Sequence, residues 1–88
     1  MKMHELKTIN PYFNDVWFTL KEFEIRKDDR NFMEDDLLWM REYDPETKEY
    51  SGRSMLAKIT YILPAGQFEG LSQGYCCIQI SVIDRRTK

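Results

Sequence analysis

Residues 19–26 read Thr19-Leu20-Lys21-Glu22-Phe23-Glu24-Ile25-Arg26, and the spacing of apolar residues changes within them from helical to extended. From Glu22 to Arg26 apolar and charged side chains alternate, which is typical of a half-buried strand. The alternation predicts that Phe23 and Ile25 face the core. It also predicts that Glu22, Glu24 and Arg26 share the opposite, outward face.

A helix is expected before this strand. Asn10-Pro11 resembles a helix start, because asparagine is a good N-cap and proline is favoured in the first turn. Apolar residues then recur with helical spacing and predict one buried face, formed by Tyr12, Phe13, Val16, Trp17 and Leu20.

Four further segments have the composition of strands, and they are His4–Ile9, Leu37–Tyr43, Arg53–Leu63 and Tyr75–Ile83. In the third, Ala57, Ile59, Tyr61 and Leu63 are expected on one face. Pro64–Gly74 is expected to be a loop and Asp84–Lys88 a polar tail. The predicted fold class is α+β, a small, strongly curved mixed sheet or barrel of about five strands with one helix after the first strand. Residues 1–88 are expected to form a single domain.

Composition limits the function. The net charge is −2, whereas a protein that holds nucleic acid by bulk charge is usually basic, so a nucleic-acid site would have to be a local patch or pocket. The N-terminus has no apolar signal region, and no apolar run is long enough to span a membrane, which predicts a cytoplasmic protein that binds no membrane.

The cysteines and the histidine indicate no metal site and no cofactor. Cys76 and Cys77 are adjacent, so their side chains would leave a strand on opposite faces, and two reduced thiols are expected. His4 is the single histidine, and it is assigned no role. Without a spaced cysteine pair, zinc binding is not predicted.

Residues 19–26 resemble the signature G-x-K-x-x-E-x-R of the ASCH domain, a branch of the PUA-like superfamily. Phe32–Leu37 is similar to that family's F-x-x-G-D-x-L segment, and Arg41–Thr47, which reads REYDPET, is similar to its R-E-W/Y-D-P-x-T hairpin. The resemblance extends from about His4 to Val82 and is nearest to small bacterial and phage-encoded members of unassigned function. Thr19 and Asp35 stand where the family has glycine, at turns in which glycine supplies unusual backbone angles.

The resemblance implies a PUA-like barrel with a cleft between barrel and helix that binds RNA or a nucleotide. Lys21, Glu24 and Arg26 would line this cleft. Arg26 and Lys21 are suited to phosphate, and Glu24 to an exocyclic amine or a ribose hydroxyl. From residue types alone, an ordinary surface cluster of ion pairs is the competing interpretation.

Several other residues are candidates for the border of the cleft. Lys27, Arg30, Arg41 and Arg53 would form a positive rim, although interspersed carboxylates equally fit a solvated surface of mixed charge; these are Asp28, Asp29, Asp35 and Asp36. The tail residues Arg85, Arg86 and Lys88 are expected to serve solubility more than phosphate contact. Trp39 and Tyr43 would either stack on a base or pack in the core.

Three hypotheses therefore stand. The first is an RNA- or nucleotide-binding module, the second a hydrolase acting on a modified nucleoside or RNA, and the third a phage accessory or protein-interaction domain. Catalytic members of the ASCH superfamily have a threonine nucleophile where Glu24 stands, so a non-catalytic role is favoured. A monomer or weak homodimer is expected.

Overall fold

The computed structural model describes residues 1–87, and its elements follow the order β-α-β-β-β-β that the sequence predicts. Their bounds are β1 Met3–Thr8, α1 Tyr12–Trp17, β2 Phe23–Lys27, β3 Leu37–Asp44, β4 Glu49–Leu63 and β5 Tyr75–Arg86. The expected five strands and the single helix after the first of them are confirmed.

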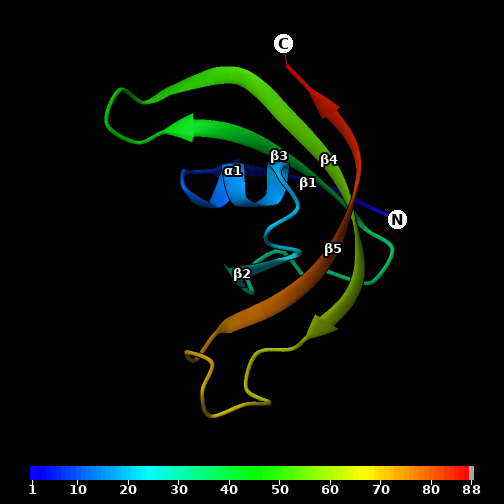
Figure 1. Ribbon diagram of the computed structural model, residues 1–88. Coiled ribbons are helices and arrows are strands. Elements are labelled where there is room, and N and C mark those ends of the chain that lie inside the picture. Colours follow the sequence, from blue (N-terminus) through cyan, green and yellow to red (C-terminus); the bar gives the residue numbers. More distant parts are fainter. Residues whose placement is uncertain (88) are drawn as a thin grey trace.

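All five strands form one mixed sheet, in the order β1-β3-β4-β5-β2. β1 pairs with β3 in parallel, and the other neighbours are antiparallel. Bulges interrupt the β3–β4 and β4–β5 ladders, and such irregularities increase the twist and bend of a strand. Figure 1 shows the result, a half-barrel whose long strands β4 and β5 curve around α1 and β2.

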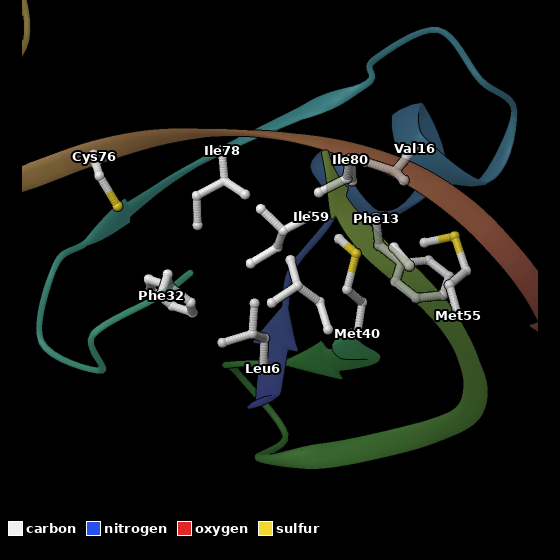
Figure 2. Packing of buried hydrophobic residues seen from close by; sticks show 12 residues of the cluster. Leu6, Phe13, Val16, Phe32, Met40, Met55, Ile59, Cys76, Ile78 and Ile80 are labelled. Atoms are coloured by element: carbon white, nitrogen blue, oxygen red, sulfur yellow. The ribbon is translucent and has the colours of Figure 1, made fainter. Parts of the chain in front are cut away.

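The core fills the concave side of the half-barrel. Leu38 and Met40 of β3 and Cys76, Ile78 and Ile80 of β5 point into it, which confirms the predicted alternation of β5. In Figure 2, Phe13 and Val16 of α1 lie at one end of this cluster beside Met55, and Phe32 lies at the other end. The helix and the segment before β3 therefore close the two ends of a core that the sheet encloses.

The prediction of which face of β2 meets the core was wrong. Glu24 is buried, with 3% of its surface exposed, whereas Phe23 and Ile25 are 44% and 51% exposed. The register explains this, because Glu24 and Arg26 lie opposite the inward-facing Ile78 and Cys76 of β5. Alternation identified which residues share a face, but the charged face turned out to be the inner one.

The helix is shorter than its apolar stripe suggested. It ends at Trp17, and Thr19 adopts a left-handed φ of 61°. Leu20 consequently lies outside the helix and is 79% exposed, and Tyr12 is 51% exposed, so only part of the predicted buried face is correct. The residue at the N-cap is Pro11 rather than Asn10, whose Oδ1 instead accepts a hydrogen bond from the Asn14 N–H at 3.0 Å.

Strand boundaries and one strand face also differ from expectation. The β4–β5 register shifts between Ile59 and Tyr61, which puts Tyr61 on the exposed side and Ile62 against the core. β1 lies one residue earlier than predicted, β4 begins earlier at Glu49, and β5 continues through part of the expected polar tail to Arg86. Lys88, the last residue of that tail, lies outside the described residues. Across residues 1–87, no helix has the length and apolar character needed to cross a membrane.

Candidate functional site

A cleft of about 730 Å³ opens where β2 forms the free edge of the sheet. β1 and the start of α1 form its other wall. Its lining comprises Lys7, Thr8, Ile9, Tyr12, Asp15, Lys21, Phe23, Glu24, Ile25, Arg26, Lys27 and Tyr75. Lys21, Glu24 and Arg26, which were predicted to line a cleft together, therefore all line this cleft.

Glu24 lies between two cations at the base of this cleft. Lys21 Nζ donates to Glu24 Oε1 at 2.7 Å, and Arg26 Nε donates to Glu24 Oε2 at 3.0 Å. The Glu24 side chain is 4% exposed, against 16% for Lys21 and 25% for Arg26. A carboxylate this deeply buried needs such pairing, because an uncompensated buried charge is strongly unfavourable. Since both its oxygens are engaged, Glu24 is placed to orient the cations rather than to contact a ligand.

The two cations retain donors that Glu24 does not use. Lys21 Nζ donates one hydrogen bond within the described residues, although an ammonium group has three donors. Nη1 of Arg26 donates none among residues 1–87, because its bonds use Nε and Nη2. Two positive charges share one negative charge, so this group carries a net positive charge within a chain whose net charge is −2. An anion is the ligand that such a group attracts.

Aromatic rings surround the Lys21 ammonium. Its Nζ lies 5.7 Å from the centroid of the Tyr12 ring and 5.0 Å from that of Phe23. Both rings are substantially exposed, as is Tyr75, which also lines the cleft. Exposed rings beside a cation are the arrangement that lets a nucleobase stack while its phosphate is neutralised.

Arg26 also joins the two free edges of the sheet. Its Nη2 donates to the Lys7 carbonyl at 3.1 Å and to Thr8 Oγ1 at 3.3 Å, both on β1. Arg30 similarly donates from Nη1 to the Glu5 carbonyl. Two carbonyl groups on the free edge of β1 thus accept hydrogen bonds from arginine side chains on the opposite side of the cleft.

The four residues predicted to form a positive rim around the cleft do not lie together. Lys27 lines the cleft, and Arg30 lies against β1. Arg41 is on the outer face of β3, where its guanidinium lies 4.8 Å from the Trp39 ring centroid and pairs with Glu5 at 2.7 Å. Arg41 is next to the inward-facing Met40, so the alternation along β3 carries it away from the cleft.

Arg53 belongs to a different network. It donates from Nε and Nη2 to Glu42 at 2.9 and 2.7 Å, and from Nη2 to Asn14 Oδ1. Its guanidinium lies 4.9 Å from the ring centroids of Phe13 and Trp17. The hydrogen bonds from Arg53 lower the pKa of Glu42 to about 2, against the opposing effect of burial. This network fixes α1 against the β3–β4 hairpin.

Sequence analysis missed a buried pair, His4 and Asp36. His4 Nε2 lies 2.9 Å from Asp36 Oδ2, and the His4 ring is tilted against Phe32 at 4.7 Å between centroids. Asp36 also accepts from the backbone N–H groups of Lys2 and Met33. Burial raises the pKa of Asp36, but these hydrogen bonds outweigh it and lower the pKa to about 2. Asp36 is therefore not part of a solvated surface. Asp36 comes 32 positions after His4 in the sequence, so no local sequence pattern predicts that the two residues pair.

The cysteines form no disulfide. Cys76 and Cys77 are free thiols, and burial raises the pKa of Cys76. Over residues 1–87 there is no group of three or more histidine, cysteine or acidic side chains arranged to hold a metal ion.

One family model matches this chain. It is described as a domain of unknown function (DUF3850), and it matches residues 3–80, which include every strand but the end of β5 and all the residues that bring cations to the cleft. No curated protein matches the chain.

Proposed function

Since the chain belongs to the DUF3850 family, whose description names no activity, we propose from the site that it binds a nucleotide unit, either free or within single-stranded RNA. The phosphate lies against Lys21 and Arg26, and the base stacks on an exposed ring of the cleft. The observation that carries this proposal is the inward-facing Glu24 with one cation on each oxygen.

The burial of this charged group favours a site over an ordinary surface cluster. Exposed ion pairs contribute about 0–1 kcal/mol and need no particular position. Glu24 instead takes an inward position on β2 that a hydrophobic residue would fill at lower desolvation cost, while Phe23 and Ile25 remain exposed. An arrangement that places apolar residues outside and charges inside a cleft is expected where the charges serve binding.

The resemblance to the ASCH signature supports the same function. The lysine, glutamate and arginine of that signature correspond to Lys21, Glu24 and Arg26, which converge in the cleft. We extend the proposal to the fold, as a PUA-like barrel that is open between β1 and β2. Hydrolysis has no comparable support, because Glu24 stands at the family's nucleophile position with both oxygens already hydrogen-bonded.

The proposal is tested by fluorescence anisotropy with labelled single-stranded RNA and by competition with free nucleoside monophosphates. The variant is Lys21→Gln, because Lys21 contributes charge to the cleft without joining the two sheet edges. We expect at least about a tenfold loss of affinity. The slope of the logarithm of affinity against the logarithm of salt concentration should fall by about one, which corresponds to one fewer ion released. Competition by the monophosphates at similar concentration would identify the free nucleotide as the ligand.

Lys58→Gln is the matched control. Lys58 carries the same charge but lies outside the cleft, where its Nζ is 3.3 Å from Asp35. We expect this variant to change affinity less than about twofold, since it alters only the long-range field. Equal losses in both variants, or no binding of RNA or nucleotide by the wild type at low salt, would contradict the proposal.

A further inference from the structure

β2 uses only one of its two edges for pairing. The Ile80 N–H donates to the Glu22 carbonyl at 3.0 Å, and the Asp28 N–H donates to the Gly74 carbonyl at 2.8 Å. Hydrogen-bonded pairs recur at every second residue of an antiparallel ladder, so the backbones of Glu24 and Arg26 also face β5. The N–H and C=O groups of the intervening residues, Phe23, Ile25 and Lys27, point away from β5 to the free edge.

The free edge opens into the cleft, and most of its backbone groups have no partner among residues 1–87. The Lys27 carbonyl accepts from the Asp29 N–H at 2.9 Å. For Phe23 and Ile25, neither the N–H nor the C=O has a hydrogen-bond partner in the part of the chain that the structure describes. These groups are therefore available to a ligand in the cleft.

We infer that the main chain of Ile25 reads the Watson–Crick edge of an unpaired nucleobase. An extended residue at a sheet edge presents its N–H and C=O side by side in one direction. That pair complements a base edge on which an acceptor and a donor are adjacent. This inference rests on the proposed function and specifies its ligand as a nucleotide whose base pairs with nothing else.

The neighbouring side chains suit the remaining parts of such a nucleotide. Lys21 and Arg26 hold donors for the phosphate, and the Tyr12 and Phe23 rings flank the Lys21 ammonium. A base in contact with the edge of β2 therefore lies next to a ring on which it can stack. A double-stranded nucleic acid should not bind in this way, because its Watson–Crick edges are already paired with the opposite strand.

The length of the free edge favours a base over an added peptide strand. Strand addition gains its affinity from a row of main-chain hydrogen bonds. Within the described residues of β2, only Phe23 and Ile25 have both the N–H and the C=O unused. Beyond them, Arg26 reaches across to the Lys7 carbonyl at 3.1 Å and narrows the opening. A single base needs one residue with both groups free.

The test compares adenosine monophosphate with ribose 5-phosphate, which lacks the base, in binding to the wild type, Ile25→Pro and Ile25→Val. Proline removes the backbone N–H at position 25 but leaves the backbone hydrogen bonds between β2 and β5. Proline is tolerated on an edge strand where its nitrogen faces outward. We expect the wild type to bind the nucleotide about tenfold or more tighter than ribose 5-phosphate, Ile25→Val to retain this preference and Ile25→Pro to lose most of it. Ile25→Pro should lower the affinity for ribose 5-phosphate much less than the affinity for the nucleotide.

A second measurement requires no variant. In ¹H–¹⁵N spectra of the wild type, adenosine monophosphate should shift the Ile25 amide, whereas ribose 5-phosphate and the monophosphate of 1-methyladenosine, whose Watson–Crick edge is blocked, should not. An unshifted Ile25 amide at saturating nucleotide, or an undiminished preference in folded Ile25→Pro, would overturn the inference. Extended peptides that shift this amide when the nucleotide does not would also overturn it. Binding of ribose 5-phosphate through Lys21 tests the proposed function separately, so the two failures are distinguishable.

Discussion

Thr19 shows how a single residue can hold a strained backbone at the junction between α1 and β2. It follows α1 with φ of 61°, in the left-handed region where a β-branched residue is a genuine outlier. Asp35, before β3, has φ of 73°. These are the two positions at which the ASCH signature has glycine, and both have backbone angles that glycine adopts most easily.

We predict that Thr19→Gly stabilises the protein. Glycine removes a steric cost of about 1–2 kcal/mol, partly offset by the greater freedom of glycine in the unfolded chain, which leaves a gain of roughly 1 kcal/mol. Urea denaturation at pH 7 measures it, with Thr60→Gly as a control at an exposed strand position where glycine should destabilise. A loss of stability in Thr19→Gly would show that the Thr19 side chain makes a compensating contribution.

At the scale of elements, β2 is an edge strand of five residues that pairs along one side. One edge pairs with β5, and Arg26 ties the other side to β1 through the Lys7 carbonyl and Thr8 Oγ1. The same arginine helps to neutralise Glu24. The side chain that we propose for phosphate binding therefore also attaches the strand to β1.

We predict that Arg26→Met loosens β2 locally. Losing these bonds should lower the free energy of local opening by about 1–2 kcal/mol, so that hydrogen exchange at the Glu24 and Arg26 amides becomes roughly ten times faster. The Ile59 amide on β4, in the interior of the sheet, should change much less. Arg41→Met removes an arginine from the outer face and should leave β2 protected; accelerated exchange there in both variants would contradict the proposed attachment.

At the scale of the whole molecule, two carboxylates join segments that are distant in sequence. Asp36 holds β1 to the turn before β3 through His4 and the Lys2 N–H. Glu42 on β3 accepts hydrogen bonds from Arg53 on β4 and from Asn10, which lies just before α1. Both have a pKa lowered to about 2, from ordinary values of 3.8 and 4.5. Each therefore stabilises the folded chain only while it is ionised.

Acid should therefore unfold the protein over a defined range. The contribution of the two groups is complete above about pH 5, the upper side of their unfolded pKa values, and is lost as pH falls towards 2, at roughly 2 kcal/mol for Asp36 and roughly 3 kcal/mol for Glu42. Urea midpoints measured between pH 7 and pH 2.5 test this. Asp36→Asn should be less stable at pH 7 and lose less on acidification; an equally steep loss in the variant would exclude Asp36 as a main source.

The order and type of the elements followed from local chemistry. The change of apolar spacing at residues 19–26 separated α1 from β2, and the alternation of Cys76, Ile78 and Ile80 predicted the buried face of β5. Local alternation also placed Glu24 and Arg26 on one face, because residues two apart on a strand share a face. These predictions depended only on neighbours in the chain, which the sequence contains directly.

What only the tertiary structure decided was which face of each element meets the core. Polarity placed Phe23 and Ile25 inside, but pairing with β5 turned Glu24 inward, since opposite residues on paired strands share a face. The same kind of non-local contact joined His4 to Asp36, and the pairing of β3 with β1 and β4 fixed the face that carries Arg41 away from the cleft. Register and sheet order depend on all the contacts between segments that are distant in sequence. The local spacing of apolar residues carries no information about those contacts.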